Sequence, residues 1–140
     1  LFPVGRLDKD TEGLLLLTND GPLGHRLLAP KKHVDKVYFV RVDGKLDQED
    51  SAAFRAGMTL GDGLQCLPAE LEVLESPDTG LVTLRKGMYH QVKRMLAARG
   101  KPVLYLKRLS MGPIALDQDL APGAWRPLTE AEREALEGLR

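Results

Sequence analysis

The sequence has little cysteine, few aromatic residues and no excess charge of either sign. Its one cysteine, Cys66, excludes an internal disulfide and a cysteine-rich zinc cluster. The apolar run Leu14–Leu17 is far shorter than the roughly 20 residues that a membrane-spanning helix needs. Zero net charge and 43% hydrophobic residues exclude a chain that is disordered throughout. A length of 140 residues suits one soluble domain, and we expect a reducing, cytoplasmic location.

The charge is neutral overall but uneven along the chain. Residues 47–84 carry eight acidic side chains and one basic side chain, whereas residues 85–108 carry eight basic and no acidic side chains. Such a basic segment repels itself unless opposite charge lies nearby. Either RNA or DNA supplies that charge, or the basic groups pair with the acidic segment and face solvent. Composition leaves both readings open. A weaker basic cluster consists of Arg26, Lys31, Lys32, Lys36, Arg41 and Lys45.

Apolar spacing and turn residues predict short strands interspersed with short helices. We expect strands over residues 13–18, 36–42, 70–74, 81–84 and 103–109. We expect helices over residues 22–29, 47–56, 89–98 and 129–139, the second capped by Asp47 and the last by a capping box of Thr129 and Glu132. The irregular order of these elements indicates an α+β layer fold.

The densest group of polar residues lies in the segment GRLDKDTEG, residues 5–13. Asp8, Asp10 and Glu12 alternate there, which first suggests a cation site or a metal-dependent nuclease. A calcium loop of the EF-hand type would need a bidentate acid at its twelfth position, where this chain has Asn19. The histidines are too widely spaced to complete a metal site, so we expect no metal.

Five segments resemble, in the right order, the motifs of the small-subunit rRNA branch of the pseudouridine synthases. They are GRLDKDTEGLLLLTNDG (5–21), KVYFVRV (36–42), GMYHQVKRMLAARG (87–100), LYLKRLSMG (104–112) and LAPGAWRPLTEAE (120–132). The resemblance covers nearly the whole chain. It implies the α+β catalytic-domain fold of that family, with a mixed, mainly antiparallel sheet flanked by helices and loops. It also implies isomerisation of a uridine in small-subunit (16S) rRNA, with rRNA as partner and no cofactor.

The resemblance assigns roles to individual residues of this sequence. Asp8 corresponds to the essential catalytic aspartate, and Lys93 to the basic residue that pairs with it. Tyr38 corresponds to the tyrosine that stacks on the target uracil, and Leu106 to the apolar floor of the pocket. Arg6 corresponds to an arginine that fills the gap left by a flipped base. Further RNA contacts are expected from Lys32, His90, Gln91, Arg94, Lys107 and Arg108.

The family pattern also contains parts that this chain lacks. An N-terminal RNA-binding domain of the S4 type and the first strands of the catalytic domain usually precede the aspartate motif. We therefore expect residues 1–140 to be a partial catalytic domain with an exposed sheet edge, through which a homodimer could form. The alternatives are a truncated, non-catalytic RNA-binding remnant and a synthase acting on large-subunit (23S) rRNA.

Overall fold

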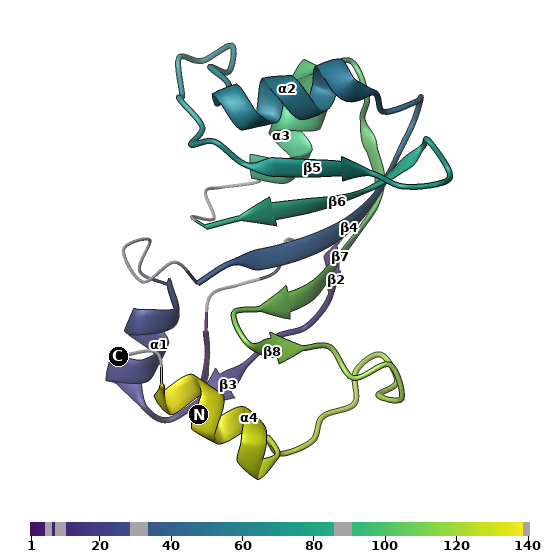
Figure 1. Ribbon diagram of the computed structural model, residues 1–140. Helices are drawn as coiled ribbons and strands as arrows, with labels where there is room; N and C mark the ends of the chain where they lie inside the picture. Colours follow the sequence, from purple (N-terminus) through teal and green to yellow (C-terminus); the bar gives the residue numbers. More distant parts are fainter. Residues whose placement is uncertain (5–6, 8–10, 29–33, 86–90, 139–140) are drawn as a thin grey trace.

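A six-stranded sheet forms the centre of the protein. The computed structural model describes residues 1–4, 7, 11–28, 34–85 and 91–138 (Figure 1). The strands run in the order β2-β7-β4-β6-β5, and β8 pairs with the end of β7. Their bounds are β2 Thr11–Gly13, β4 Lys36–Val42, β5 Glu70–Val73, β6 Thr79–Leu84, β7 Val103–Met111 and β8 Ile114–Ala115.

The pairing in this sheet is mixed and mainly antiparallel. β4 pairs antiparallel with both β6 and β7, and β5 pairs antiparallel with β6, whereas β2 pairs parallel with β7. The α+β class and the mainly antiparallel sheet predicted from the sequence are therefore confirmed.

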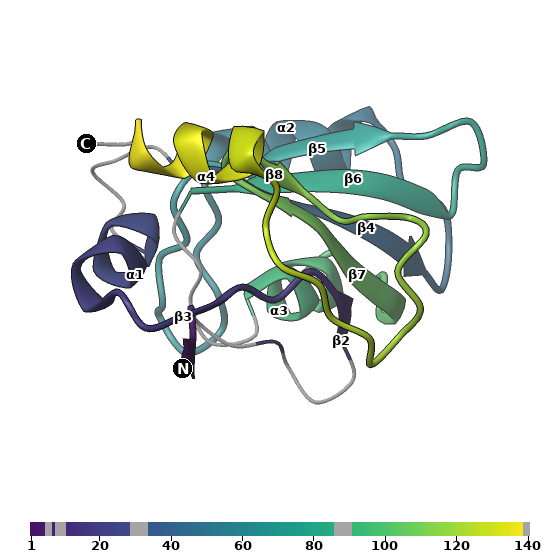
Figure 2. The same cartoon turned by 90° about the horizontal axis from the view of Figure 1, so that it is seen from below.

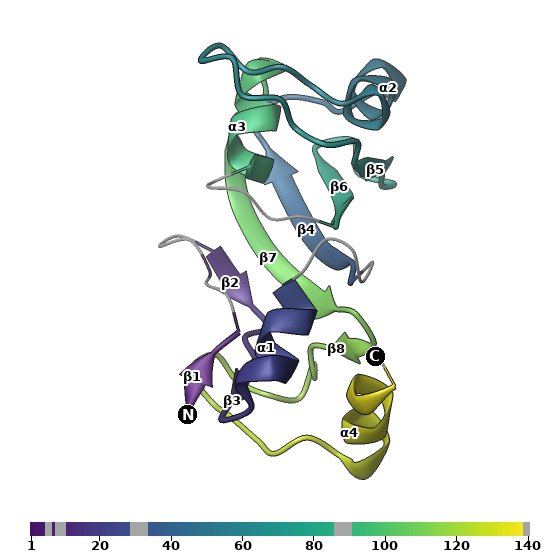
Figure 3. The ribbon, with the colours of Figure 1, turned by 90° about the vertical axis from the view of Figure 1, so that its left-hand side faces the viewer.

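One core lies between the sheet and two helices, α2 (Gln48–Ala56) and α3 (Gln91–Ala98). Both helices lie at the same end of the molecule (Figure 3). β4 and β7 contribute Val40 and Leu106 to this core, and α3 contributes Met95. The spacing of Val92, Met95 and Leu96 gives α3 the apolar face that the sequence predicts.

A second core lies at the opposite end of the molecule. There α1 (Gly21–Leu28) and α4 (Glu130–Glu137) lie near a small sheet of β1 (Phe2–Pro3) and β3 (Leu17–Thr18) (Figures 2 and 3). This core contains Leu27, Met111 and Leu136. Because β7 reaches both cores, it connects the two ends of the molecule.

Helix caps occur where the sequence predicts them. Asp47 and Asp50 form a capping box at the start of α2, and Thr129 and Glu132 form one at the start of α4. The helix expected over residues 22–29 is α1, shifted by one residue. None of the helices in the described residues is long and apolar enough to cross a membrane.

The single strand predicted over residues 13–18 is wrong. β2 ends at Gly13, which has a positive φ of 114°, and β3 starts only at Leu17. Leu15 and Leu17 are 41% and 55% exposed, so the four leucines do not fill both faces of one buried strand.

Candidate functional site

Two neighbouring strands place Tyr38, Leu106 and Arg108 on one face of the sheet. Tyr38 lies opposite Arg108 in the register of β4 with β7, and Val40 lies opposite Leu106. Tyr38 is half-buried and packs against the first core, while Leu106 is 3% exposed within it. The aromatic ring and the apolar floor that the family resemblance predicts therefore lie on adjacent strands of the same face.

Strand β2, which follows Asp8 in the sequence, pairs with β7 beside Leu106 and Arg108. Thr11 pairs with Leu106 and Gly13 pairs with Arg108 in the parallel ladder. Asp8 precedes Thr11 by three positions in the sequence. Asp8 itself lies outside the described residues, as do the other predicted site residues Arg6, Lys32 and His90.

α3 carries three further predicted residues, Gln91, Lys93 and Arg94. Lys93 is half-buried. Gln91 is 4% exposed, and its Nε2 atom lies 3.5 Å from Sδ of Met95. Arg94 forms an ion pair with Asp62, and the Leu64 N–H and the Arg94 guanidinium together lower the pKa of that carboxyl.

Much of the basic segment pairs with acids of the same chain. Arg85 lies 3.3 Å from Asp35, and Arg94 and Arg99 pair with Asp62 and Asp50. Composition left two explanations for the basic segment open, binding to nucleic acid or pairing with acids of the same chain. Pairing within the chain accounts for these arginines.

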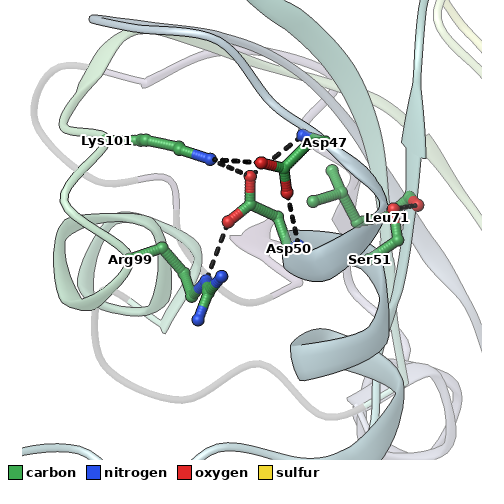
Figure 4. Close-up of polar contacts among 6 residues, drawn as sticks. All are labelled: Asp47, Asp50, Ser51, Leu71, Arg99 and Lys101. Atoms are coloured by element: carbon green, nitrogen blue, oxygen red, sulfur yellow. Dashed lines mark hydrogen bonds and ion pairs between the residues drawn. The ribbon is translucent and has the colours of Figure 1, made fainter.

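Asp50 is the most heavily paired acid in the described residues, and Figure 4 shows its surroundings. Its side chain is fully buried and accepts hydrogen bonds from Nε of Arg99 at 2.7 Å and from Nζ of Lys101. Burial by itself would raise the pKa of Asp50, but the hydrogen bonds from Lys101, Arg99 and the Asp47 N–H lower it. Arg99 and Lys101 directly follow α3, so this network ties the end of that helix to the start of α2.

The expectation that Arg108 and Gln91 contact RNA must be corrected. Arg108 is 2% exposed, because strand alternation turns its side chain inward, where Nε donates to the Leu14 carbonyl at 2.7 Å. The side chain of Gln91 faces Met95 within α3 and is also buried. A contact with an external phosphate requires an exposed donor, which neither residue offers.

Lys36, a member of the weaker basic cluster, is a buried cation. It is 4% exposed and begins β4. Burial lowers the pKa of Lys36, and the positive charge of Arg108 lowers it further against the opposing effect of Asp35. The alternation of β4 could have revealed this, because Lys36 shares parity with buried Val40.

Lys107 lies on the other face of the sheet. It is opposite Phe39 in β4 and opposite Glu12 in β2. The Phe39 and Tyr105 rings meet edge to face with centroids 6.1 Å apart, and the Tyr105 hydroxyl donates to Glu12 at 2.9 Å. A contact of Lys107 with RNA would therefore occur on the face away from Tyr38.

Glu12 also bears on the nuclease alternative. Its carboxylate accepts a hydrogen bond from Tyr105, and the other two acids of that proposed site, Asp8 and Asp10, lie outside the described residues. Within the described residues, no group of three histidine, cysteine, aspartate or glutamate side chains could hold a metal ion.

An apolar cavity of about 930 Å³ lies at the other end of the molecule, beside the second core. Its lining includes Leu15, Leu17 and Trp125, together with Glu12 and Lys107 from the outer face of the sheet. Among the described residues, neither Tyr38 nor Leu106 lines this cavity, whereas Leu7, the neighbour of Asp8 in the sequence, does.

Comparison with known proteins gives consistent matches. The family described as RNA pseudouridylate synthase matches residues 1–98. The chain is 51% identical over 139 residues to an uncharacterized RNA pseudouridine synthase, YtzG, of Bacillus subtilis, covering 96% of this chain and 58% of the relative. It is 44% identical over 137 residues to ribosomal small subunit pseudouridine synthase A of Haemophilus influenzae, covering 97% of this chain and 59% of the relative. The chain thus spans less than two thirds of the length of these relatives.

Solved structures give the same fold. A crystal structure of a pseudouridylate synthase superimposes with a TM-score of 0.89 at 43% identity, covering 96% of this chain and 58% of the other. A chain of the archaeal box H/ACA Nop10–Cbf5 complex superimposes with a TM-score of 0.54 at 20% identity, covering 86% of this chain and 41% of the other, and shows the fold alone. The family match over residues 1–98, together with the close relatives, establishes that this chain belongs to the RNA pseudouridylate synthase family.

Proposed function

We propose that the protein isomerises a specific uridine of small-subunit rRNA to pseudouridine. The observation that carries this proposal is the 44% identity to relatives named ribosomal small subunit pseudouridine synthase A, over nearly all of this chain. The face that bears Tyr38 and Leu106, with β2 leading to it from Asp8, is consistent with a uridine pocket.

The proposed reaction conserves atoms and needs no oxidant or reductant. The N1–C1′ bond of uridine breaks, the uracil turns over, and C5 bonds to C1′. The hydrogen on C5 leaves as a proton, and N1 gains a proton. A carboxylate beside C1′ can act as a nucleophile or as a base toward the sugar, and it stabilises positive charge developing on the ribose.

The proposed roles follow from this chemistry. Asp8 is the catalytic carboxylate, and Lys93 is its cationic partner, because an ionised carboxylate in a closed pocket needs one. Tyr38 stacks on the uracil, and Leu106 floors the pocket. Arg6 fills the place of the flipped base, whose extrusion costs a few kcal/mol.

Phosphate contacts that offset this cost must come from basic residues other than Arg108. Lys32 and His90 keep that proposed role, and Arg94 can take it only in addition to its ion pair with Asp62.

The test is release of tritium from small-subunit rRNA labelled at C5 of uridine. We expect release by the wild type and none by Asp8→Asn, with RNA affinity of the variant within a few-fold of wild type. Release from large-subunit rRNA instead would favour the 23S alternative. RNA binding without release from either substrate would support the non-catalytic remnant.

We propose two further properties of the protein, a cytoplasmic location and a homodimer. A modifier of ribosomal RNA acts where ribosomes are assembled, which supports a cytoplasmic location. A homodimer through an exposed edge would use an edge strand of the six-stranded sheet, such as β2 or β5. Sedimentation that shows only monomer at high protein concentration would exclude this dimer.

A further inference from the structure

We propose that Arg108 is a positioning residue, which fixes the strand following the catalytic aspartate against the floor of the pocket. This inference rests on the proposed function and deepens it. The residue acts through Leu14 and Gly13, and it is assigned no contact with the substrate.

Arg108 contacts both main-chain polar groups of Leu14. The Arg108 carbonyl accepts a hydrogen bond from the Leu14 N–H at 2.9 Å, and Nε of Arg108 donates to the Leu14 carbonyl at 2.7 Å. Gly13 is paired with Arg108 in the parallel ladder. A short edge strand such as β2 has few ladder bonds, so the side-chain bond adds a substantial share of its attachment.

The place of Arg108 in β7 makes this attachment rigid. Two residues before it, Leu106 is buried in the first core, and three residues after it, Met111 is buried in the second. Tyr38 lies directly opposite on β4. Holding Leu14 to Arg108 therefore fixes β2 relative to both the ring and the floor of the candidate pocket.

The chemistry of the side chain supports a positioning role over a stabilising one. Arg108 is nearly fully buried, and its Nη2 atom has no hydrogen-bond partner among the described residues. Buried Lys36 adds a repulsive positive charge. Counting the described residues alone, a buried cation with this little compensation destabilises a fold relative to an apolar residue of similar size. Its planar guanidinium, however, gives the Nε donor a fixed direction that a lysine lacks.

The kinetic test compares Arg108→Met and Arg108→Lys with wild type in the tritium-release assay. A displacement of about 1 Å at a catalytic group can reduce the rate about 100-fold. We expect kcat to fall between about 10-fold and 100-fold in Arg108→Met with KM within about 3-fold, and Arg108→Lys to recover part of the loss. Arg55→Met, at an exposed site on α2, is the matched control and should keep wild-type kcat.

Hydrogen exchange tests the same attachment without relying on activity. We expect the Leu14 amide to exchange about 10-fold faster in Arg108→Met, while the Val42 amide, bonded to the Asp78 carbonyl, stays unchanged. If Arg108→Met does not fold, Arg108→Lys is used, with a smaller increase expected. Wild-type exchange at Leu14, or a wild-type kcat in the folded variant, overturns the inference. If the wild type releases no tritium, the proposed function fails, and exchange alone decides whether Arg108 holds β2.

Discussion

Gly13 lies directly against the main chain of Arg108. A Cβ atom on Gly13 would come within 2.2 Å of the Arg108 carbonyl oxygen and 2.5 Å of its nitrogen, and the φ of Gly13 is 114°. Any side chain at this position would push β2 away from β7 and would strain its own backbone. The approach of the two strands, and with it the course of the chain after Asp8, therefore depends on a glycine.

Gly13→Ala is expected to lower the free energy of unfolding by about 3 kcal/mol, because the clash is with main chain that cannot rotate away. Urea denaturation measures this loss. Gly61→Ala is the matched control, since no atom lies within 4 Å of a Cβ built there, and its change should stay within about 0.5 kcal/mol. Equal stability of the two variants would show that β2 can shift without penalty.

The sequence predicts more of the fold than of the site. Strand alternation in residues 36–42 and the capping boxes at Asp47 and Thr129 are local patterns, and the structure reproduces them. The break at Gly13 was missed because four leucines in succession have no periodicity that would reveal it. Only the neighbouring strand explains why a glycine is needed there.

The partners of the basic residues could not be predicted for a related reason. Arg99 and Asp50 are 49 residues apart in the chain, and Arg94 and Asp62 are 32 apart. No local pattern reports such contacts. A count of positive charge therefore overestimates how much of residues 85–108 is available to RNA, and burial removes Arg108 from that surface altogether.

Asp50→Asn is expected to lower the free energy of unfolding by about 3 kcal/mol. The substitution places a neutral amide in the fully buried position of Asp50 and weakens its hydrogen bonds with Arg99 and Lys101, although Lys101 still lies 3.6 Å from Asp47. A hydrogen bond to a charged group contributes about 1.5–3 kcal/mol. Thermal or urea unfolding gives the value. Asp62→Asn is the comparison, because its pair with Arg94 is solvent-exposed and should matter much less. A loss no larger than that of Asp62→Asn would contradict a structural role for the Asp50 network.

Lys36→Met is expected to raise the free energy of unfolding at pH 7 by about 1 kcal/mol, because it removes a desolvated cation beside Arg108. The pKa of Lys36 is below its usual 10.5 in the folded protein, so the folded protein loses this proton first as pH rises. The free energy of unfolding of the wild type therefore rises between that lowered pKa and pH 10.5. Its difference from the free energy of unfolding of Lys36→Met should shrink over this range. Lys45→Met, at an exposed position, is the control and should show no such convergence.

Glu132 should make the stability of the region around α4 depend on acid pH. Its hydrogen bonds with Arg126 and with the Thr129 N–H lower its pKa from 4.5 to about 2. The stabilisation is fully present above pH 4.5 and is lost as pH falls through about 2, because protonation removes the charge that Arg126 binds. Glu132→Gln keeps a side chain that can complete the capping box but has no charge to lose. Its unfolding free energy should therefore fall less steeply than that of wild type between pH 4.5 and 2, whereas exposed Glu134→Gln should follow wild type. Equal slopes for Glu132→Gln and wild type would mean that the pair with Arg126 contributes nothing measurable in solution.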